Sequence, residues 1–353
     1  MKRIASIVLL AGLLAAAAGC HRRPLVDMEG LVAIKVTIDL DTVCNIKSNI
    51  YNDQIAKPNT ESDMLRVFLY DHKTHQQVAQ TFISENSYDQ AGHQVFTGYM
   101  NINYGTFDFL IYNFDTPNTL IKGENNEDEI EAYTSSMSQT VAQAFASANT
   151  GINENSLISY QPDHLMVAQE QNYYIAPHTD IVTMETTAHT CINTYYIQIH
   201  VEGMQYVAGC SAVISGLYSG NKFGRNPGTP VNLGERIADP ATAVYFNLEK
   251  STDKNIAGEN KDVLCALFNT FGKIEDISSD LYVTFNAVDT EGNQIKKEVS
   301  LDVVFRSADA LERHWLLLDE TWIIEDPNPH PVGGGGFQPV VDDWDEQHGE
   351  IEL

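Results

Sequence analysis

Cys20 is the residue whose surroundings most clearly predict chemistry. The chain begins with two basic residues, continues with the apolar run 4–14 and reaches Cys20 through the small residues 15–19. A basic start, a short apolar core and small residues before a cut are typical of a secretory signal. A cysteine directly after Ala-Ala-Gly matches the bacterial lipobox, in which the thiol is acylated and the cysteine becomes the N-terminus. We therefore expect residues 1–19 to be a signal peptide and Cys20 to be lipidated.

Fatty acyl chains on Cys20, palmitate among them, would hold the protein at a membrane. Each buried methylene contributes about 0.8 kcal/mol, so several chains give stable anchoring where one holds only marginally. The rest of the chain has no run of ~20 apolar residues that could cross a bilayer. The alternative is a secreted protein in which Cys20 is incidental.

Catalytic patterns are absent from the sequence. It contains no G-x-S-x-G, no H-E-x-x-H, and no lysine followed by Ser or Thr after the glycine run 333–336. His72 and His75 stand in a predicted turn, where solvated side chains are a more ordinary interpretation than a metal site. We expect no cofactor, no metal and no enzymatic activity.

Two acidic groups have other possible roles. Four carboxylates surround Trp344, a pattern that glycosidases and cation sites share with solvated tails; they are Asp342, Asp343, Asp345 and Glu346. The run 125–129 offers oxygen ligands for calcium but lacks EF-hand spacing. A solvated tail and a solvated helix start are the interpretations that we prefer.

Composition sets further limits. The formal net charge of −27 argues against binding nucleic acid or an anionic membrane face. Beyond Cys20 the chain has four cysteines, namely Cys44, Cys191, Cys210 and Cys265. Export permits disulfides, but their spacing favours free buried thiols slightly over one disulfide, and both states stay open.

The elements that must position any site are mostly strands. Residues 31–40 alternate between apolar and polar side chains, which predicts a half-buried antiparallel strand. Further strands are expected at 64–70, 78–83, 94–101, 106–113, 195–201, 208–218 and 243–248. The run 263–271 is apolar on both faces, which indicates a central strand, and a glycine-containing turn joins 281–287 to 295–305 as a hairpin.

One segment differs. Residues 127–148 are acidic at the start and alanine-rich later, with apolar residues at helical spacing, which predicts one inserted helix. Many short strands with marked turns predict an all-β fold of two tandem sandwiches. We place the first domain at 20–185, the second at 186–325 and a Pro/Gly-rich linker with an acidic strand or tail at 326–353.

The tail has a possible role in assembly. Glycines 333–336 precede Phe337, Val341 and Trp344, which could add a strand to another subunit. The alternative is a last strand that packs on its own domain, since exposed aromatics favour aggregation.

These features resemble the fimbrillin-like accessory lipoproteins of Bacteroidota, the anchor and tip subunits of type V pili. The resemblance rests on the lipobox at Cys20, on the strand 105–113 that ends in Tyr-Asn, on 163–168 with the later 199–203 and 215–218, and on 333–337 followed by Trp344. It implies two transthyretin-like β-sandwiches and a role in fimbrial assembly or adhesion at the outer membrane, with other fimbrial subunits as partners.

Two questions stay open at this point. Basic residues 21–23 follow the cysteine where surface lipoproteins of this phylum often carry acidic ones, so either the cell surface or the periplasmic face is possible. The alternative function is a glycan-binding surface lipoprotein of a polysaccharide-utilisation system. Its sugar-stacking candidates are Tyr173, Tyr174, Tyr195, Tyr196, Tyr206, Tyr218, Trp315 and Trp322.

Overall fold

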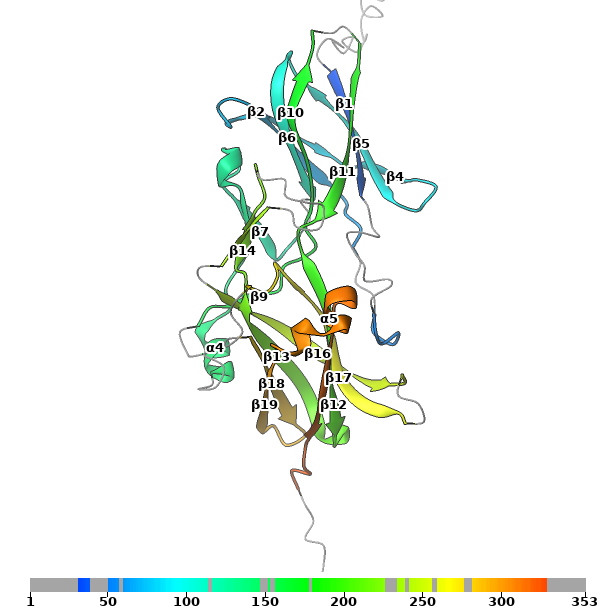
Figure 1. Cartoon of the computed structure of the whole chain (residues 1–353), viewed down its shortest axis with the longest axis vertical. Coiled ribbons are helices and arrows are strands. Elements are labelled where there is room, and N and C mark those ends of the chain that lie inside the picture. Colours follow the sequence, from blue (N-terminus) through cyan, green and yellow to red (C-terminus); the bar gives the residue numbers. More distant parts are fainter. Residues whose placement is uncertain are drawn as a thin grey trace, which may run out of the picture.

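The computed structural model describes residues 31–328 except 39–49, 57–59, 114–115, 147–151, 153–155, 178–179, 226–233, 239–240, 256–258 and 276–280. Most of this part of the chain is β-strand, arranged as two large sheets and one small sheet along the long axis of the molecule (Figure 1). The expected all-β fold of two sandwich-like domains is confirmed.

The first large sheet has eight strands in the order β3-β2-β6-β10-β11-β1-β5-β4. Their bounds are β1 Leu31–Ile38, β2 Leu65–Asp71, β3 Gln77–Ile83, β4 Glu85–Tyr88, β5 Gln94–Asn101, β6 Gly105–Asn113, β10 Met166–Ile175 and β11 Val182–Thr190. The predicted strand at 31–40 is present as β1, but it is antiparallel only to β5 and runs parallel to β11, because it lies inside a mixed sheet. The sheet curls on itself, so that Ile83 at the end of β3 lies over Gly98 of β5. A Cβ atom on Gly98 would stand 1.9 Å from Cγ2 of Ile83, so this closure depends on a glycine.

Strands β2 and β6 are buried on both faces. Val67 and Leu69 enter the core of the first domain, whereas Phe68 and Tyr70 enter a second cluster on the opposite face. Complete burial of one such side chain contributes about 1.5–3 kcal/mol. This second cluster requires a cover, and a small third sheet supplies it.

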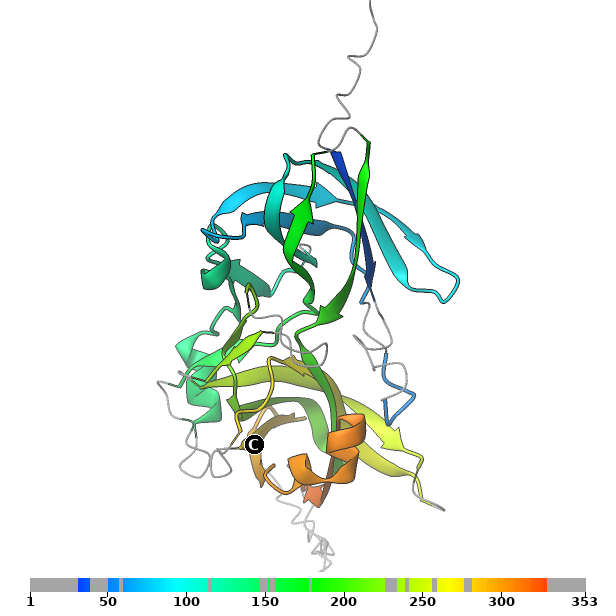
Figure 2. The same ribbon diagram turned by 45° about the horizontal axis from the view of Figure 1, so that its top comes forward.

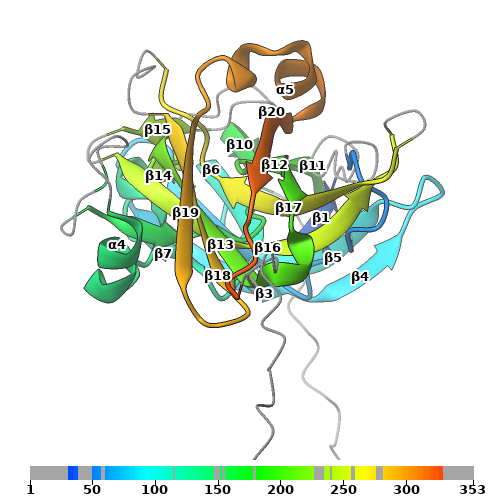
Figure 3. The same ribbon diagram turned by 90° about the horizontal axis from the view of Figure 1, so that it is seen from below.

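The second large sheet has the order β19-β18-β13-β16-β17-β12-β20, with β9 paired to β16. The bounds are β9 Ile158–Tyr160, β12 Asn193–Glu202, β13 Val207–Leu217, β16 Thr242–Asp253, β17 Lys261–Thr270, β18 Tyr282–Asp289, β19 Gln294–Ser300 and β20 Trp315–Ile323. The predicted central strand is confirmed as β17, and the predicted hairpin as β18–β19. The second strand of that hairpin ends at Ser300 and not at residue 305, because the chain turns into a 3₁₀ helix over Val304–Arg306. The edge strands β19 and β20 approach each other (Figure 3), and Lys297 forms a 2.6 Å ion pair with Glu320 between them.

The third sheet, β15-β14-β8-β7, joins segments that lie about a hundred residues apart. Its strands are β7 Thr119–Lys122, β8 Glu131–Thr134, β14 Gly220–Lys222 and β15 Glu235–Ile237. Figure 2 shows it beside the junction of the large sheets.

The expected domain boundary at 185/186 falls inside β11, which pairs with β1 from Val182 to Ala188 and with β10 at Thr190. The chain therefore changes sheet after Thr190, and β9 and the third sheet interleave the two halves.

The single long helix expected at 127–148 is wrong. The chain forms a 3₁₀ turn η1 (Glu127–Glu129), then β8, then the short helix α4 (Gln139–Phe145). Ile130 and Ala132 are both fully buried, so burial in the first half repeats every second residue, as in a strand. This part of the chain is β8 of the third sheet. Tertiary pairing overrides the helical spacing there, and only the alanine-rich half becomes helical.

The remaining helical turns are short. They are η2 Met204–Tyr206, η3 Val304–Arg306 and α5 Ala308–Arg313. Among the described residues, no helix has the length and apolar character needed to cross a membrane.

A segment before β2 fastens the first half of the chain to the second sheet. Tyr51 and Asn52 pack there, and the Asn52 amide donates a 2.9 Å hydrogen bond to the Ser251 hydroxyl. Asp253, buried to 1% exposure, accepts hydrogen bonds from Gln198 at 3.0 Å and from the Tyr51 hydroxyl at 3.3 Å. The N-terminal segment and the β16–β17 hairpin thus share one buried carboxylate.

Candidate functional site

The residues to which the sequence assigns lipidation and strand exchange lie outside the described residues. These are Cys20, Phe337, Val341 and Trp344, and the acidic residues around Trp344 lie there as well. The strands nearest to them in sequence are described. Strand β1 begins at one end of the long axis, and the chain leaves β20 at the opposite end (Figures 1 and 2).

Exposed sheet edges are the features that suit strand pairing. Among the described strands, β4 has no partner on its outer side, and all four of its residues are exposed. Tyr88 on β4 is 53% exposed, and Val78 and Phe82 of the other edge strand, β3, are exposed as well. An unpaired edge is a template for a strand from another chain.

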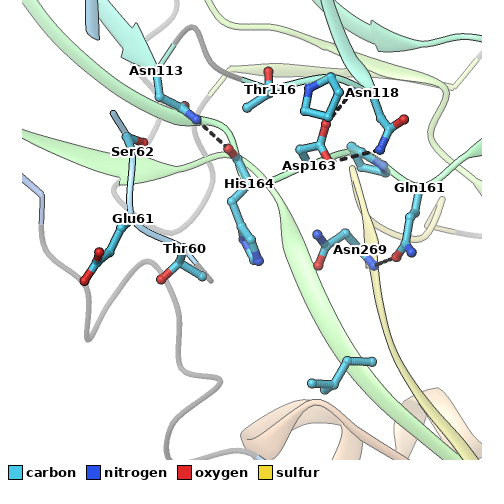
Figure 4. A pocket seen from close by; sticks show the side chains of 13 residues that line it. Thr60, Glu61, Ser62, Asn113, Thr116, Asn118, Gln161, Asp163, His164 and Asn269 are labelled. Carbon is cyan, nitrogen blue, oxygen red and sulfur yellow. Dashed lines mark hydrogen bonds between the residues drawn. The ribbon is translucent and has the colours of Figure 1, made fainter. Parts of the chain in front are cut away.

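A cavity of about 320 Å³ lies at the junction of the two large sheets (Figure 4). Amide and carboxylate side chains line much of it, and they are held by mutual hydrogen bonds. Asn118 donates to Asp163 at 3.1 Å, and the backbone N–H of Asn269 donates to the Gln161 side chain at 3.1 Å. Hydrogen bonds therefore hold part of the polar lining in place, and Leu267, Pro117 and Pro162 add apolar surface.

His164 stands in this cavity with only 9% of its surface exposed. Its backbone carbonyl accepts a 2.8 Å hydrogen bond from Asn113, but neither ring nitrogen has a hydrogen-bond partner among the described residues. Burial lowers the pKa of the imidazole to about 4, although nearby Asp163 acts in the opposite direction. The ring is neutral at physiological pH.

A second polar group gathers His72, His75, Asp108 and Glu127, here called the His–carboxylate cluster. The His75 Nδ1 atom lies 3.3 Å from Glu127 Oε2 and 4.0 Å from Asp108 Oδ2. The His72 Nδ1 atom lies 2.9 Å from Asp108 Oδ1. Both histidines come from the turn between β2 and β3, Asp108 from β6 and Glu127 from η1, so three separate segments converge.

The two carboxylates of this cluster are each 1% exposed. Burial, and then repulsion from Asp108, raise the pKa of Glu127 to about 7. The β10 bulge supports the cluster, because the backbone N–H of Asn172 donates a 2.6 Å hydrogen bond to Asp108. The sequence did not predict this group, since the two histidines were interpreted as solvated turn residues.

The cysteines and the proposed sugar-stacking aromatics differ in how far they are buried. Cys191, Cys210 and Cys265 are free thiols; Cys191 and Cys265 are buried and Cys210 is partly buried, while Cys44 lies outside the described residues. Of the proposed sugar-stacking residues, Tyr195, Tyr196 and Trp322 are buried in the core; Tyr173, Tyr206, Tyr218 and Trp315 are intermediate and Tyr174 is 67% exposed. Tyr196 and Trp315 both contact the Tyr51 ring, with ring centroids 5.8 and 5.2 Å from it. Glycan binding remains an untested prediction.

The chain matches a known protein family. Residues 19–233 match the model of a family described as "Domain of unknown function (DUF5119)". This match spans more than half of the chain, so the protein belongs to that family.

One relative and one solved structure, both from Bacteroides ovatus, extend the comparison. The relative is named "Putative fimbrium anchoring subunit Fim4B"; it is 22% identical over 97% of this chain and 96% of its own length. The solved structure is described as a "putative adhesin"; it is 18% identical, covers 88% of this chain and 98% of its own, and has a TM-score of 0.53. The resemblance to fimbrial accessory proteins expected from the sequence is thereby confirmed.

Proposed function

We propose that the protein is a non-enzymatic accessory subunit of a cell-surface fimbria, of the anchor type. The observation that carries this proposal is the end-to-end similarity to a relative named as a fimbrium anchoring subunit. The fold agrees with it, because two curled sheets present edges and loops to other chains. In this role the protein binds fimbrial subunits and contributes to adhesion.

The anchor in this proposal is acylated Cys20 in the outer membrane. Strand β1, the first described element after Cys20, begins at one end of the long axis (Figure 1). The first sheet then lies near the membrane and the second sheet farther away. With this polarity, the end of β20 faces the growing fimbria.

Strand addition by the tail is the proposed contact with the partner. Main-chain hydrogen bonds would give affinity, and Phe337, Val341 and Trp344 would fill side-chain pockets. The partner is a second fimbrial subunit with a free sheet edge.

A pull-down from membranes in mild detergent tests this contact. The full chain should retain fimbrial subunits in high-molecular-weight ladders, and a chain ending at Glu325 should lose them. A triple variant, Phe337→Ser, Val341→Ser and Trp344→Ser, should lose them too. Replacing Asp342 and Asp343 with Asn is the matched control and should retain them. Monomer in every sample would refute the proposal.

The anchor needs its own experiment. Cells fed an alkynyl palmitate analogue should label the wild-type protein, and Cys20→Ser should abolish both the label and the membrane association. Cys44→Ser is the matched control, since it removes a thiol far from the signal. Equal labelling of Cys20→Ser and wild type would contradict the lipid anchor.

A further inference from the structure

We propose that the His–carboxylate cluster binds one Zn²⁺ ion, with His75, Asp108 and Glu127 as ligands. This site lies in the folded body of the first domain and is independent of the fimbrial role. Its ligand atoms all lie within 4.8 Å of one another. Zinc–ligand bonds of about 2.0–2.2 Å bring tetrahedral ligand atoms to roughly 3.4 Å from each other, so only small movements are needed.

The charges of the cluster favour a cation. Asp108 and Glu127 are almost fully buried and adjacent, and among the described ion pairs none joins either carboxylate to a lysine or arginine. Arg225 forms its ion pair with the exposed Asp128 at 3.6 Å, and its charge has only the smallest of the effects on the pKa of Glu127. Buried charges in proteins are paired or coordinate metals, and a divalent ion would neutralise both carboxylates.

The chemistry of the donors selects the metal. One imidazole nitrogen and two carboxylate oxygens, in a group this compact, suit Zn²⁺ better than Ca²⁺, which takes six to eight oxygen ligands. His72 has a different role, since its Nδ1 atom lies 2.9 Å from Asp108. As a hydrogen-bond donor to the ligating carboxylate, it is a positioning residue.

The backbone around the site is built to hold these side chains. His75 has a φ of 56°, an uncommon conformation for a residue other than glycine, and its carbonyl accepts a 2.9 Å hydrogen bond from the N–H of Glu127. Asn172, at a φ of 56°, stands in the β10 bulge and donates to Asp108. Such outliers concentrate at functional sites. The ion would tie the β2–β3 turn and β6 to the connection between β7 and β8 of the third sheet.

Zinc titration of the full chain in mild detergent, after dialysis against a chelator, tests the site. Competition with a chromophoric chelator should give one Zn²⁺ per chain at micromolar or lower Kd, and zinc should raise the Tm. Glu127→Gln and His75→Asn should each weaken binding at least tenfold. Asparagine is chosen at position 75 because it tolerates positive φ. His72→Asn should weaken binding less than either.

The matched control is His93→Asn. His93 also pairs with an aspartate, Asp89, at 3.1 Å, but in an exposed turn. This variant should bind zinc as the wild type does. The proposal is overturned if the wild type binds no zinc at micromolar concentration, if it binds Ca²⁺ in preference, or if folded Glu127→Gln and His75→Asn proteins retain wild-type affinity. Circular dichroism of the metal-free variants establishes that they are folded.

Discussion

Acid should destabilise this protein partly through His164, and replacing that residue with leucine should remove this part. The imidazole is buried, and its pKa is lowered to about 4 from an ordinary 6.5. Between those two values the unfolded chain takes up a proton that the folded chain does not. The contribution of neutral His164 to the unfolding free energy is therefore fully present above pH 6.5, and it is lost as the pH falls toward 4.

The magnitude follows from the shift. One pKa unit corresponds to about 1.36 kcal/mol, so the difference between 6.5 and about 4 amounts to roughly 3 kcal/mol. The chain carries 48 aspartates and glutamates, whose own titrations also change stability in acid. Only the difference between wild type and variant isolates the histidine.

Urea unfolding at pH 8, 6.5, 5.5 and 4.5 measures that difference. At pH 8 both proteins lack a charge at position 164, so their difference in unfolding free energy reports packing alone. The unfolding free energy of His164→Leu should then gain on that of the wild type as the pH falls, by about 2.5 kcal/mol at pH 4.5. Parallel profiles would refute the argument, because they would mean that the ring takes up its proton equally in both states.

Three further predictions test the core. Gly98→Ala should destabilise the fold by about 1–3 kcal/mol in thermal melts, because its Cβ meets Ile83; adding Ile83→Ala should restore part of the loss. Asn113→Ala should cost about 2 kcal/mol in urea titration, because its buried side chain bonds two backbone groups at 2.7 and 2.8 Å; an unchanged midpoint would contradict this. Burial raises the pKa of Cys191 to about 12 and of Cys265 to about 11, so both thiols should resist a thiol reagent at pH 8 until the chain unfolds.

Local periodicity made the strands predictable. The alternating run from Leu31, the apolar run that became β17 and the glycine turn between β18 and β19 all appear where expected. Each of these signals lies within about ten residues, where side-chain direction follows directly from the pleat.

The third sheet was not predictable in the same way. Its strands have three or four residues, and β8 pairs with β14 almost ninety positions later in the chain. Segments so short carry no clear alternation, so the helical spacing of residues 127–148 dominated the interpretation. In the folded protein, Ile130 and Ala132 instead pack on the buried cluster around Phe68 and Tyr70, and this packing favours a strand over a helix.

The His–carboxylate cluster was missed because its members are distant in sequence. Asp108 lies 36 positions after His72, and Glu127 lies 52 positions after His75. One signal was present: Asp108 interrupts an otherwise apolar strand between two phenylalanines. A carboxylate on a strand buried on both faces requires a partner, and that requirement identifies β6 as the place to search.

The interleaved sheets bear on the proposed anchor. One hydrophobic cluster contains Phe68 and Leu110 of the first sheet, Phe223 after the third sheet's β14, and Phe271 after β17 of the second. Pulling the molecule from its two ends would have to open this shared cluster before either large sheet could separate from the other. A subunit held at Cys20 and loaded through its tail would benefit from that arrangement. Two tandem sandwiches joined only by a linker would instead extend at the linker under the same load.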